Sequence, residues 1–579
     1  MKKFNVCMSL LFVALIGWQI HLHIPYQLCQ LEHTNLFIGN WNWFVPFLER
    51  IGGIGRWLGT WDIQFFSETI TGTVAFAIPV IILFVVMAEL IRNQGKSMSV
   101  WIPWATGISV CQLLSLYDHN FYWSGALAMS LAMTLLWLVS LFKSSVRYVV
   151  FLLGIPVVAW GLGAVVCIYV SAGIILFARK KKWLISIAIP LVVFVAFITL
   201  IYFTGLIADI RLFLSPASYH ESGSEMPLYH WGTWGAILIF LFLARLVTYV
   251  SFKQQITSWV ICCIGWLIPS TLLVQIAGNF YNASNQDIWR LNHHAYMEDW
   301  DAILDFISDK PMNNYLFMNY ANLALANKGQ LANRAFHYYP KSMKSLLAVT
   351  NSTGTVRLMA SDIHYTVGCL AEAQQHAFEA QVTFPQSIGI QTMKRLVKTN
   401  LIFGHYEVAE KYLSLIAQTT FHQEWAKEYS KFLYNDKAIE ADAELGEKRR
   451  SLSQRNRFAM FHGWIPELQD ILEANPKNRK ALEYLGVSFL MNKDIKGFQH
   501  FLDKYYGMRK DKTLPLSFQQ AVMMLNQPKK MEEYNISSSV KKQYAQFMHQ
   551  YTQNRQNPNL KKMMYRSYGH TVWYYFIFV

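Results

Sequence analysis

Long apolar runs with at most one charged residue fill the first half of the chain and end near residue 277. A helix rises about 1.5 Å per residue, so roughly 20 apolar residues cross a hydrocarbon core about 30 Å thick. Seven runs approach this length, and each predicts a membrane-spanning helix: 4–24, 70–91, 99–116, 121–142, 183–203, 229–250 and 256–277. The first run has no small-residue cleavage site after it, which indicates an uncleaved signal-anchor.

One further apolar run, Tyr148 to Ala178, is too long for an ordinary span. Its 31 residues carry no charge, and as one helix they would extend about 46 Å. Helix-breaking residues inside the run favour an interruption, namely Gly154, Pro156, Gly161 and Gly163. We therefore expect a hairpin of two short helices, which brings the predicted total to about nine spans.

The distribution of Lys and Arg supports this hairpin. Cytoplasmic loops of membrane proteins carry an excess of these residues. With nine spans, 12 of the 15 Lys and Arg before Ala277 lie inside, among them the run Arg179 to Lys182, and only Arg50, Arg56 and Arg211 lie outside. A single span over 148–178 would leave seven inside and eight outside. We therefore expect the C-terminal region on the outer face, which is the periplasm if the protein resides in a bacterial inner membrane.

After Ala277 the apolar positions recur with the 3.6-residue period of amphipathic helices. Several helix junctions resemble the tetratricopeptide repeat, the best being FGHYEVAEKYLSLI, where Gly404, Tyr406 and Ala409 occupy the places typical of that repeat. Stacked helix pairs of this kind form a solenoid with a concave binding surface. The predicted fold is therefore all-α: a polytopic helical membrane bundle over 1–277, followed by a soluble tetratricopeptide-like α-solenoid over 278–579.

The formal net charge of +15 raises the question of a nucleic-acid partner. In the first half the basic residues flank apolar runs, and in the second half they are spread along helices without an RNA- or DNA-binding motif. We expect no nucleic acid among the partners. The seven cysteines include no CxxC pair, and the chain has no HExxH motif, no GxSxG and no glycine-rich phosphate loop. The sequence accordingly predicts neither a metal site nor a cofactor.

Two acidic residues are candidates for chemistry at the outer face. Glu32 lies beside His33 at the start of a long outer loop, 25–69, where a carboxylate could act as a general base or a metal ligand. Asp118 lies in the tight turn between the third and fourth predicted spans and could be a second acid. The alternatives are an exposed loop acid for Glu32 and an ordinary turn residue for Asp118. His220 lies in another outer loop, 204–228.

Several motifs together resemble an uncharacterised family of multi-pass membrane proteins from Bacteroidota-type bacteria, domain of unknown function 6057. They are QLEHTNLF, the IGG…W…QFF stretch from Ile51 to Phe66, NYANLALANKGQLANRAF, LIFGHYEVAEKYL followed by Trp425-Ala426, and the ending TVWYY. The resemblance covers nearly the whole chain. It implies a membrane protein and carries no established activity.

The architecture also resembles the polytopic C-type glycosyltransferases, which use lipid-linked sugars and carry a catalytic acid in a long first outer loop. Glu32 falls near the place of that acid, but His33 follows it where the family has a second acid. We expect an inner-membrane protein that displays a periplasmic helical-repeat domain for interaction or assembly with an envelope protein. The alternative is a C-type glycosyltransferase-like enzyme that uses a polyprenyl-phosphate-linked sugar, with Glu32 and Asp118 as its catalytic residues.

Overall fold

The computed structural model describes residues 2–579 except 94–100, 179–182, 208, 222, 248–254, 309, 311–313, 349–352, 385–387, 453–462, 508–513 and 526–531. The described residues form helices joined by turns and loops, with one isolated antiparallel bridge between Phe121 and His220 and no β-strand. The predicted all-α fold class is therefore confirmed. The basic run Arg179 to Lys182, which entered the prediction of topology, lies outside the described residues.

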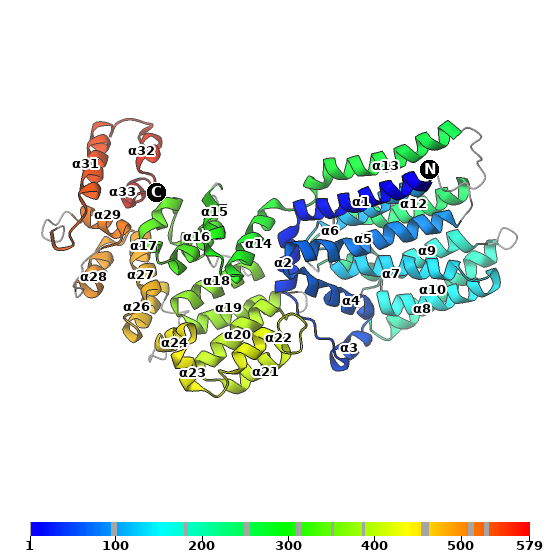
Figure 1. The fold of residues 1–579 in the computed structure, drawn as a ribbon, viewed down its shortest axis with the longest axis horizontal. Helices are drawn as coiled ribbons and strands as arrows, with labels where there is room; N and C mark the ends of the chain where they lie inside the picture. Colours follow the sequence, from blue (N-terminus) through cyan, green and yellow to red (C-terminus); the bar gives the residue numbers. More distant parts are fainter. Residues whose placement is uncertain are drawn as a thin grey trace. The chain divides into compact units, whose positions relative to one another are not determined.

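The chain divides into two compact units (Figure 1). Unit 1 consists of Met1–Asp287 and Gln418–Phe421, and unit 2 of Ile288–Ala417 and His422–Val579. The division at Asp287 lies a short distance after the boundary that the end of the apolar runs indicates.

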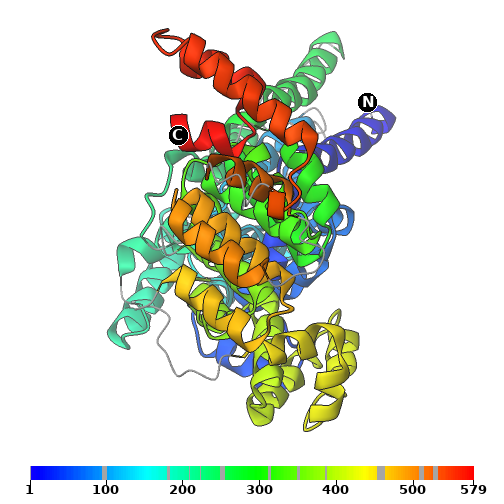
Figure 2. The same cartoon turned by 90° about the vertical axis from the view of Figure 1, so that its left-hand side faces the viewer.

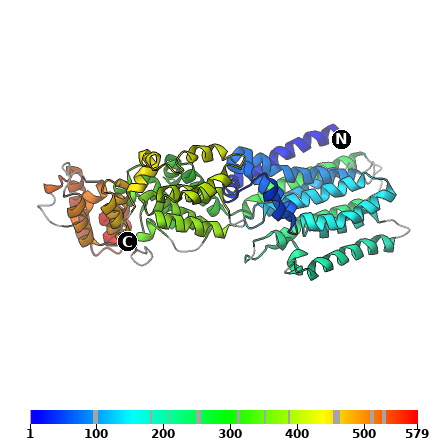
Figure 3. The same ribbon diagram turned by 90° about the horizontal axis from the view of Figure 1, so that it is seen from below.

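Among the described residues, unit 1 contains five helices that are long and apolar enough to cross a membrane: α1 (Lys2–His23), α5 (Thr69–Arg92), α7 (Trp123–Ser140), α10 (Trp183–Phe203) and α13 (Gln255–Ile276). Shorter apolar helices accompany them: α6 (Ala105–Leu116), α8 (Ser144–Leu162), α9 (Val166–Phe177) and α12 (Trp231–Val247). In Figures 1 and 3, α5, α7, α8, α9 and α10 run side by side, and neighbours among them pack together. Their apolar side chains form one continuous core.

The long apolar run 148–178 contains two helices, so the predicted break is confirmed. Helix α8 ends at Leu162, and Gly163 adopts a positive φ of 83° that favours glycine. The two helices then approach closely at other glycines. A Cβ atom at Gly154 would lie 2.2 Å from the Tyr169 hydroxyl, and one at Gly173 would lie 2.0 Å from the Phe151 ring. Glycine at these two positions therefore allows α8 and α9 to pack closely against each other as a hairpin.

The predicted outer loop 25–69 consists largely of helix. It contains α2 (Pro25–His33), α3 (Trp41–Leu48), α4 (Gly53–Ile63) and the 3₁₀ turn η1 (Gln64–Ser67). Helix α4 packs against α7 and α8, where Gly59 leaves only 3.2 Å between its would-be Cβ and Ser124. Asp62 on α4 accepts a 2.9 Å hydrogen bond from the indole N–H of Trp123. The segment is therefore packed into unit 1 by specific contacts.

Unit 2 is built from consecutive helices that pack in pairs, as Figure 2 shows for α26, α27 and α28. Its helices after α14 (Ala283–Tyr296) are α15 (Trp300–Ser308), α16 (Tyr315–Asn327), α17 (Leu331–Arg334), α18 (Gly354–Val367), α19 (Leu370–Thr383), α20 (Ile390–Phe403), α21 (Tyr406–Ile416), α22 (Gln423–Ser430), α23 (Asp436–Ala441), α24 (Ala443–Arg450), α26 (Trp464–Ala474), α27 (Arg479–Met491), α28 (Ile495–Tyr505), α29 (Leu516–Met524), α31 (Ser538–Gln553), α32 (Leu560–Tyr568) and α33 (Val572–Phe578). Gly404 ends α20 with a φ of 77° and lets α21 fold back against it.

The aromatic C-terminus packs inside unit 2. Trp573 on α33 is fully buried, and its indole N–H donates a 2.7 Å hydrogen bond to the carbonyl of Gln520. The hydroxyl of Tyr575 donates to the carbonyl of Met491 at 2.6 Å. The ending TVWYY therefore contributes to the core of the helical unit.

Candidate functional site

The turn between α6 and α7 holds Asp118 in a defined position. The backbone N–H of Asn120 donates a 3.0 Å hydrogen bond to Asp118 Oδ1, which is the usual way an aspartate stabilises a tight turn. The loop before α12 lies against this turn. Tyr122 N–H donates to the carbonyl of Tyr219 at 2.7 Å, and Glu221 N–H donates to that of Asn120 at 2.9 Å. Backbone bonds therefore place the loop that carries His220 beside Asp118.

Two histidines and a tyrosine surround the second carboxylate oxygen of Asp118. His230 Nε2 lies 2.9 Å and His220 Nε2 lies 3.3 Å from Asp118 Oδ2, and the Tyr229 hydroxyl donates to the same oxygen at 3.3 Å. The ligand atoms of Asp118, His220 and His230 all lie within 4.8 Å of one another, and all three residues are buried. We call these three residues the Asp118 cluster.

The surroundings of Asp118 favour its ionised form. Burial by itself raises the pKa of the carboxyl, but hydrogen bonds from His230, the Asn120 N–H and His220 lower it by more. The net result is a pKa well below the usual range. His220 Nδ1 lies 3.2 Å from Ser224 Oγ, whereas His230 Nδ1 has no hydrogen-bond partner among the described residues. The cluster is therefore an anion held by two imidazole rings.

An open hollow of about 550 Å³ adjoins the Asp118 cluster. Asp118 and Tyr229 line it, and the two histidines of the cluster do not. The other lining residues are mostly polar: Tyr117, His119, Asn120, Glu225, Pro227 and 279–284. A ligand in the hollow would therefore contact the Asp118 carboxylate. The two imidazoles bind that carboxylate from the side that does not line the hollow.

Two chemical roles suit this geometry. Ligands that lie about 2.0–2.2 Å from one ion are roughly 2.8–3.6 Å apart at octahedral or tetrahedral angles, and the carboxylate–imidazole distances of 2.9 and 3.3 Å fall in this interval. Two histidines and one carboxylate form a donor set that leaves positions open for substrate. Alternatively, the ionised carboxylate binds a cationic group directly. Its low pKa makes Asp118 a weak general base.

The other sequence candidate, Glu32, is not a member of this cluster. It lies on α2, where it is buried, and its Oε2 atom is 3.9 Å from Nε2 of the adjacent His33. The alternative of an exposed loop acid is therefore wrong, because Glu32 is only 5% exposed and its helix α2 packs against α5. The sequence indicates Asp118 and His220 separately, and no motif in it singles out His230 or Tyr229. A usable signal was their place at the start of the apolar run 229–250, at the same end of the helices as Asp118.

Unit 2 contains a second cavity, of about 330 Å³, which we call the basic cavity. Its charged side chains are three basic and two acidic: Lys394, Arg395, Lys398, Glu298 and Asp362. The walls come from the end of α14 and from α18, α19, α20 and α22.

The basic residues of this cavity are held in place by neighbouring groups. Arg395 pairs with Asp362 at 2.7 Å, and Lys398 pairs with Glu444 at 2.8 Å. Lys394 donates to the hydroxyl of Tyr296 at 2.7 Å and lies 5.2 Å from the ring centre of Trp425. The lining therefore has one basic side chain more than acidic ones, and these charged groups are held in fixed positions beside aromatic surface, which suits a ligand with a carboxylate.

A protein-family model matches the chain from residue 1 to residue 579, and the function of that family is not known. No curated protein and no solved structure matches the chain. Similarity to known proteins therefore assigns no chemistry to either site.

Proposed function

The chain belongs to the family of unknown function DUF6057 over residues 1–579, and from that premise we propose that it is a membrane-anchored scaffold for a partner protein. In this proposal unit 1 anchors the chain in the inner membrane of a bacterial envelope, with α1 as a signal-anchor. Unit 2 forms a tetratricopeptide-like domain on the periplasmic side. The five long apolar helices support the anchor, and the α8–α9 hairpin supports nine spans.

The observation that carries the proposal is the charge of the basic cavity. Three basic side chains face two acidic ones in a cavity built by helices of unit 2. A helical domain that binds an extended segment supplies side chains from several helices in the same way. The partner in this proposal presents a segment with carboxylate groups, from acidic side chains or a chain terminus.

Photo-crosslinking tests this proposal inside the cell. The full chain carries p-benzoylphenylalanine in place of Trp425, which lines the cavity, or in place of Tyr434, which is exposed and lies elsewhere in unit 2. We expect a discrete adduct from position 425 alone, on a partner peptide that contains Asp, Glu or a C-terminal carboxylate.

Charge reversal provides the second arm of this experiment. Lys394→Glu combined with Lys398→Glu should reduce the adduct about tenfold or more, since two favourable charges become unfavourable. Lys411→Glu on α21, an exposed lysine away from the cavity, is the matched control and should leave the adduct unchanged. Equal adducts from both positions, or an adduct that survives the double reversal, would contradict the proposal.

The Asp118 cluster favours a second candidate function, a cation-dependent transferase related to the C-type glycosyltransferases. A divalent cation on Asp118, His220 and His230 would neutralise the phosphate of a polyprenyl-phosphate-linked sugar in the adjoining hollow. The catalytic residue of this candidate is Asp118, because Glu32 lies outside the cluster.

Consumption of a radiolabelled polyprenyl-phosphate sugar by the purified chain in lipid nanodiscs tests the second candidate. Asp118→Asn should abolish turnover, and Asp209→Asn, an exposed acid outside the hollow, should not. Turnover that persists in Asp118→Asn at the wild-type rate would exclude the cluster as its source.

A further inference from the structure

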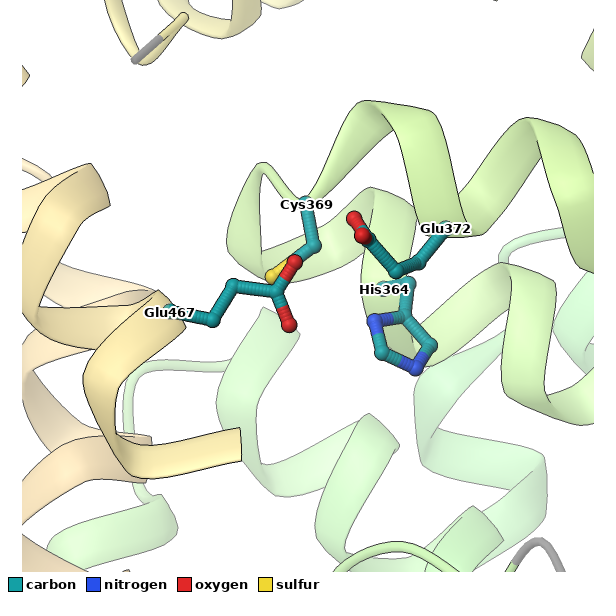
Figure 4. A group of neighbouring side chains, drawn as sticks. All are labelled: His364, Cys369, Glu372 and Glu467. Carbon is teal, nitrogen blue, oxygen red and sulfur yellow. The ribbon is translucent and has the colours of Figure 1, made fainter. Parts of the chain in front are cut away.

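Four side chains with metal-binding atoms converge inside unit 2 (Figure 4). His364 lies on α18, Cys369 directly precedes α19, Glu372 lies in the first turn of α19, and Glu467 lies in the first turn of α26. Their ligand atoms all lie within 4.8 Å of one another. Neither the membrane anchor nor the basic cavity uses any of them.

The turn between α18 and α19 brings the first three residues together. Gly368 adopts a φ of 100°, and Cys369 N–H donates a 2.9 Å hydrogen bond to the carbonyl of His364. This reversal of the chain places His364 and Cys369 on either side of one tight junction. Glu372 follows one turn later, so its carboxylate extends over the same junction, as Figure 4 shows.

Helix α26 supplies the fourth side chain from a distant part of the sequence. Trp464, in the same first turn as Glu467, packs edge-on against the His364 ring with a centroid distance of 5.2 Å. The indole N–H of Trp464 also donates to Ser488 Oγ on α27 at 3.1 Å. These contacts orient the start of α26 so that Glu467 faces the junction of α18 and α19.

The cluster gathers acidic groups in a partly buried place. His364 and Cys369 are buried, and Glu372 and Glu467 are half-buried. Two carboxylates and a thiolate within 4.8 Å of one another repel each other unless a cation lies between them. A bound divalent cation removes that repulsion.

His364 is suited to bind such a cation. Its side chain is buried, and its Nδ1 atom has no hydrogen-bond partner among the described residues. Figure 4 shows one ring nitrogen turned toward the carboxylates. Zinc binds the neutral imidazole of histidine through a ring nitrogen of this kind.

We propose that His364, Cys369, Glu372 and Glu467 bind a zinc ion. A thiolate and an imidazole select zinc over calcium and magnesium, which prefer sites composed of oxygen ligands. Tetrahedral zinc ligands lie roughly 3.3–3.7 Å apart, so donors that now span up to 4.8 Å need movements of about an ångström. Binding releases to solvent the thiol proton and the proton held by the carboxyl pair.

Four protein donors close the tetrahedral coordination sphere, so the site is structural and leaves no position for a substrate. The bound zinc ion would cross-link the first turn of α26 to the α18–α19 hairpin. The zinc site therefore stabilises the middle of the helical unit, independently of what the basic cavity binds.

Cobalt substitution of the full chain in detergent micelles tests the proposal. The chain is stripped with a chelator and then titrated with Co²⁺, the usual spectroscopic probe for zinc sites. We expect a sulfur-to-cobalt charge-transfer band in the near ultraviolet and the visible bands of tetrahedral cobalt, both abolished by Zn²⁺. The Asp118 cluster contains no thiol, so a cation there produces no such band.

Variants assign the band to the four residues. Cys369→Ser should remove the charge-transfer band, and Glu467→Gln should lower bound zinc, measured by mass spectrometry, by about one equivalent. Glu473→Gln, an exposed acid on the same helix that pairs with Lys504, is the matched control and should bind normally. Circular dichroism of each variant shows whether the helical fold is retained.

Two results would overturn the zinc site. The first is a stripped wild-type chain that binds cobalt without the charge-transfer band. The second is a folded Glu467→Gln variant with wild-type zinc affinity. If Cys369→Ser fails to fold, the isosteric Glu467→Gln decides the matter, together with a zinc-dependent rise in the melting temperature of the wild type alone.

Discussion

The Nε2 atom of His230 lies 2.9 Å from the Oδ2 atom of Asp118, although 112 positions separate the two residues in the sequence. His230 directly precedes α12, Asp118 lies two residues after the end of α6, and these two helices pack against each other. The hydrogen bond therefore links the start of α12 to the turn that follows α6. It also supplies a charge-assisted partner to a carboxylate that unit 1 buries.

Removal of the His230 imidazole should destabilise this end of unit 1. His230→Leu keeps the ring's approximate volume but leaves the buried Asp118 carboxylate with fewer donors, at an expected cost of about 2–4 kcal/mol. Hydrogen exchange should show faster opening at the amides of Tyr122 and Glu221, which donate the two backbone hydrogen bonds between the His220 loop and the Asp118 turn. His21→Leu, an exposed histidine on α1, is the control and should leave this exchange unchanged.

A single added methyl group should displace the loop that carries His220. A Cβ atom at Gly125 on α7 would lie 2.7 Å from Tyr219, too close for any packing without movement. Gly125→Ala should therefore shift Tyr219, move His220 away from Asp118 and cost about 1–3 kcal/mol. Thermal unfolding of the full chain in detergent measures the loss.

The matched control for that substitution is Gly235→Ala on α12, where nothing lies within 4 Å of the added methyl. Alanine favours a helix over glycine by about 1 kcal/mol, so this variant should be neutral or slightly more stable. Equal melting temperatures for the two variants would show that Tyr219 moves aside without loss of stability, which would contradict the prediction.

Protonation of the Asp62 carboxyl group should make unit 1 more stable in mild acid than at neutral pH. Burial raises the pKa of Asp62 to about 6, and the hydrogen bond from Trp123 offsets this only in part. The unfolded chain has an aspartate pKa of about 3.9. Between about pH 4 and pH 6 the folded state holds a proton that the unfolded state has released, so stability falls as the pH rises through this window.

The size of this effect is at most about 2–3 kcal/mol, since one pKa unit corresponds to about 1.4 kcal/mol. Asp62→Asn stays neutral at every pH and should flatten the profile between pH 4 and pH 6. Melting temperatures across this window, compared with those of Glu225→Gln, provide the measurement. A wild-type profile that rises with pH over the same interval would contradict the assignment.

The C-terminal helix should be essential to the helical unit. Trp573 is fully buried and bonded to the Gln520 carbonyl, so Trp573→Ala should cost about 3–5 kcal/mol through the cavity and the lost hydrogen bond. Ile577→Ala on the same helix removes a side chain that is 39% exposed and should cost far less. Urea unfolding followed by circular dichroism compares the two variants. Similar midpoints would mean that α33 is not part of the cooperative unit.

The helices of unit 1 follow closely from local sequence. The runs 70–91 and 183–203 correspond to α5 (Thr69–Arg92) and α10 (Trp183–Phe203). A long apolar run predicts a helix because a helix satisfies every backbone polar group within the segment. The break near Gly163 was predictable for the same reason, since glycine and proline act on the adjacent backbone.

The candidate sites depended on contacts that no local pattern encodes. The sequence separately indicated Asp118 and His220, but the bonds of Tyr122 and Glu221 to the neighbouring segment bring them together. Glu32 has an adjacent histidine and a suggestive position, yet it lies outside the Asp118 cluster. Cys369 and Glu467 carry no recognisable metal-ligand spacing, because their helices meet only in the packed unit.

By itself, therefore, the sequence determined the all-α fold class, the apolar helices and the α8–α9 break. Each of these depends on hydrogen bonding and side-chain periodicity within a few successive turns. Only the tertiary structure decided which ionisable groups share a buried place, since burial and donor distances arise when separate helices pack. The packing of separate helices brings Asp118 next to His230, and Cys369 next to Glu467.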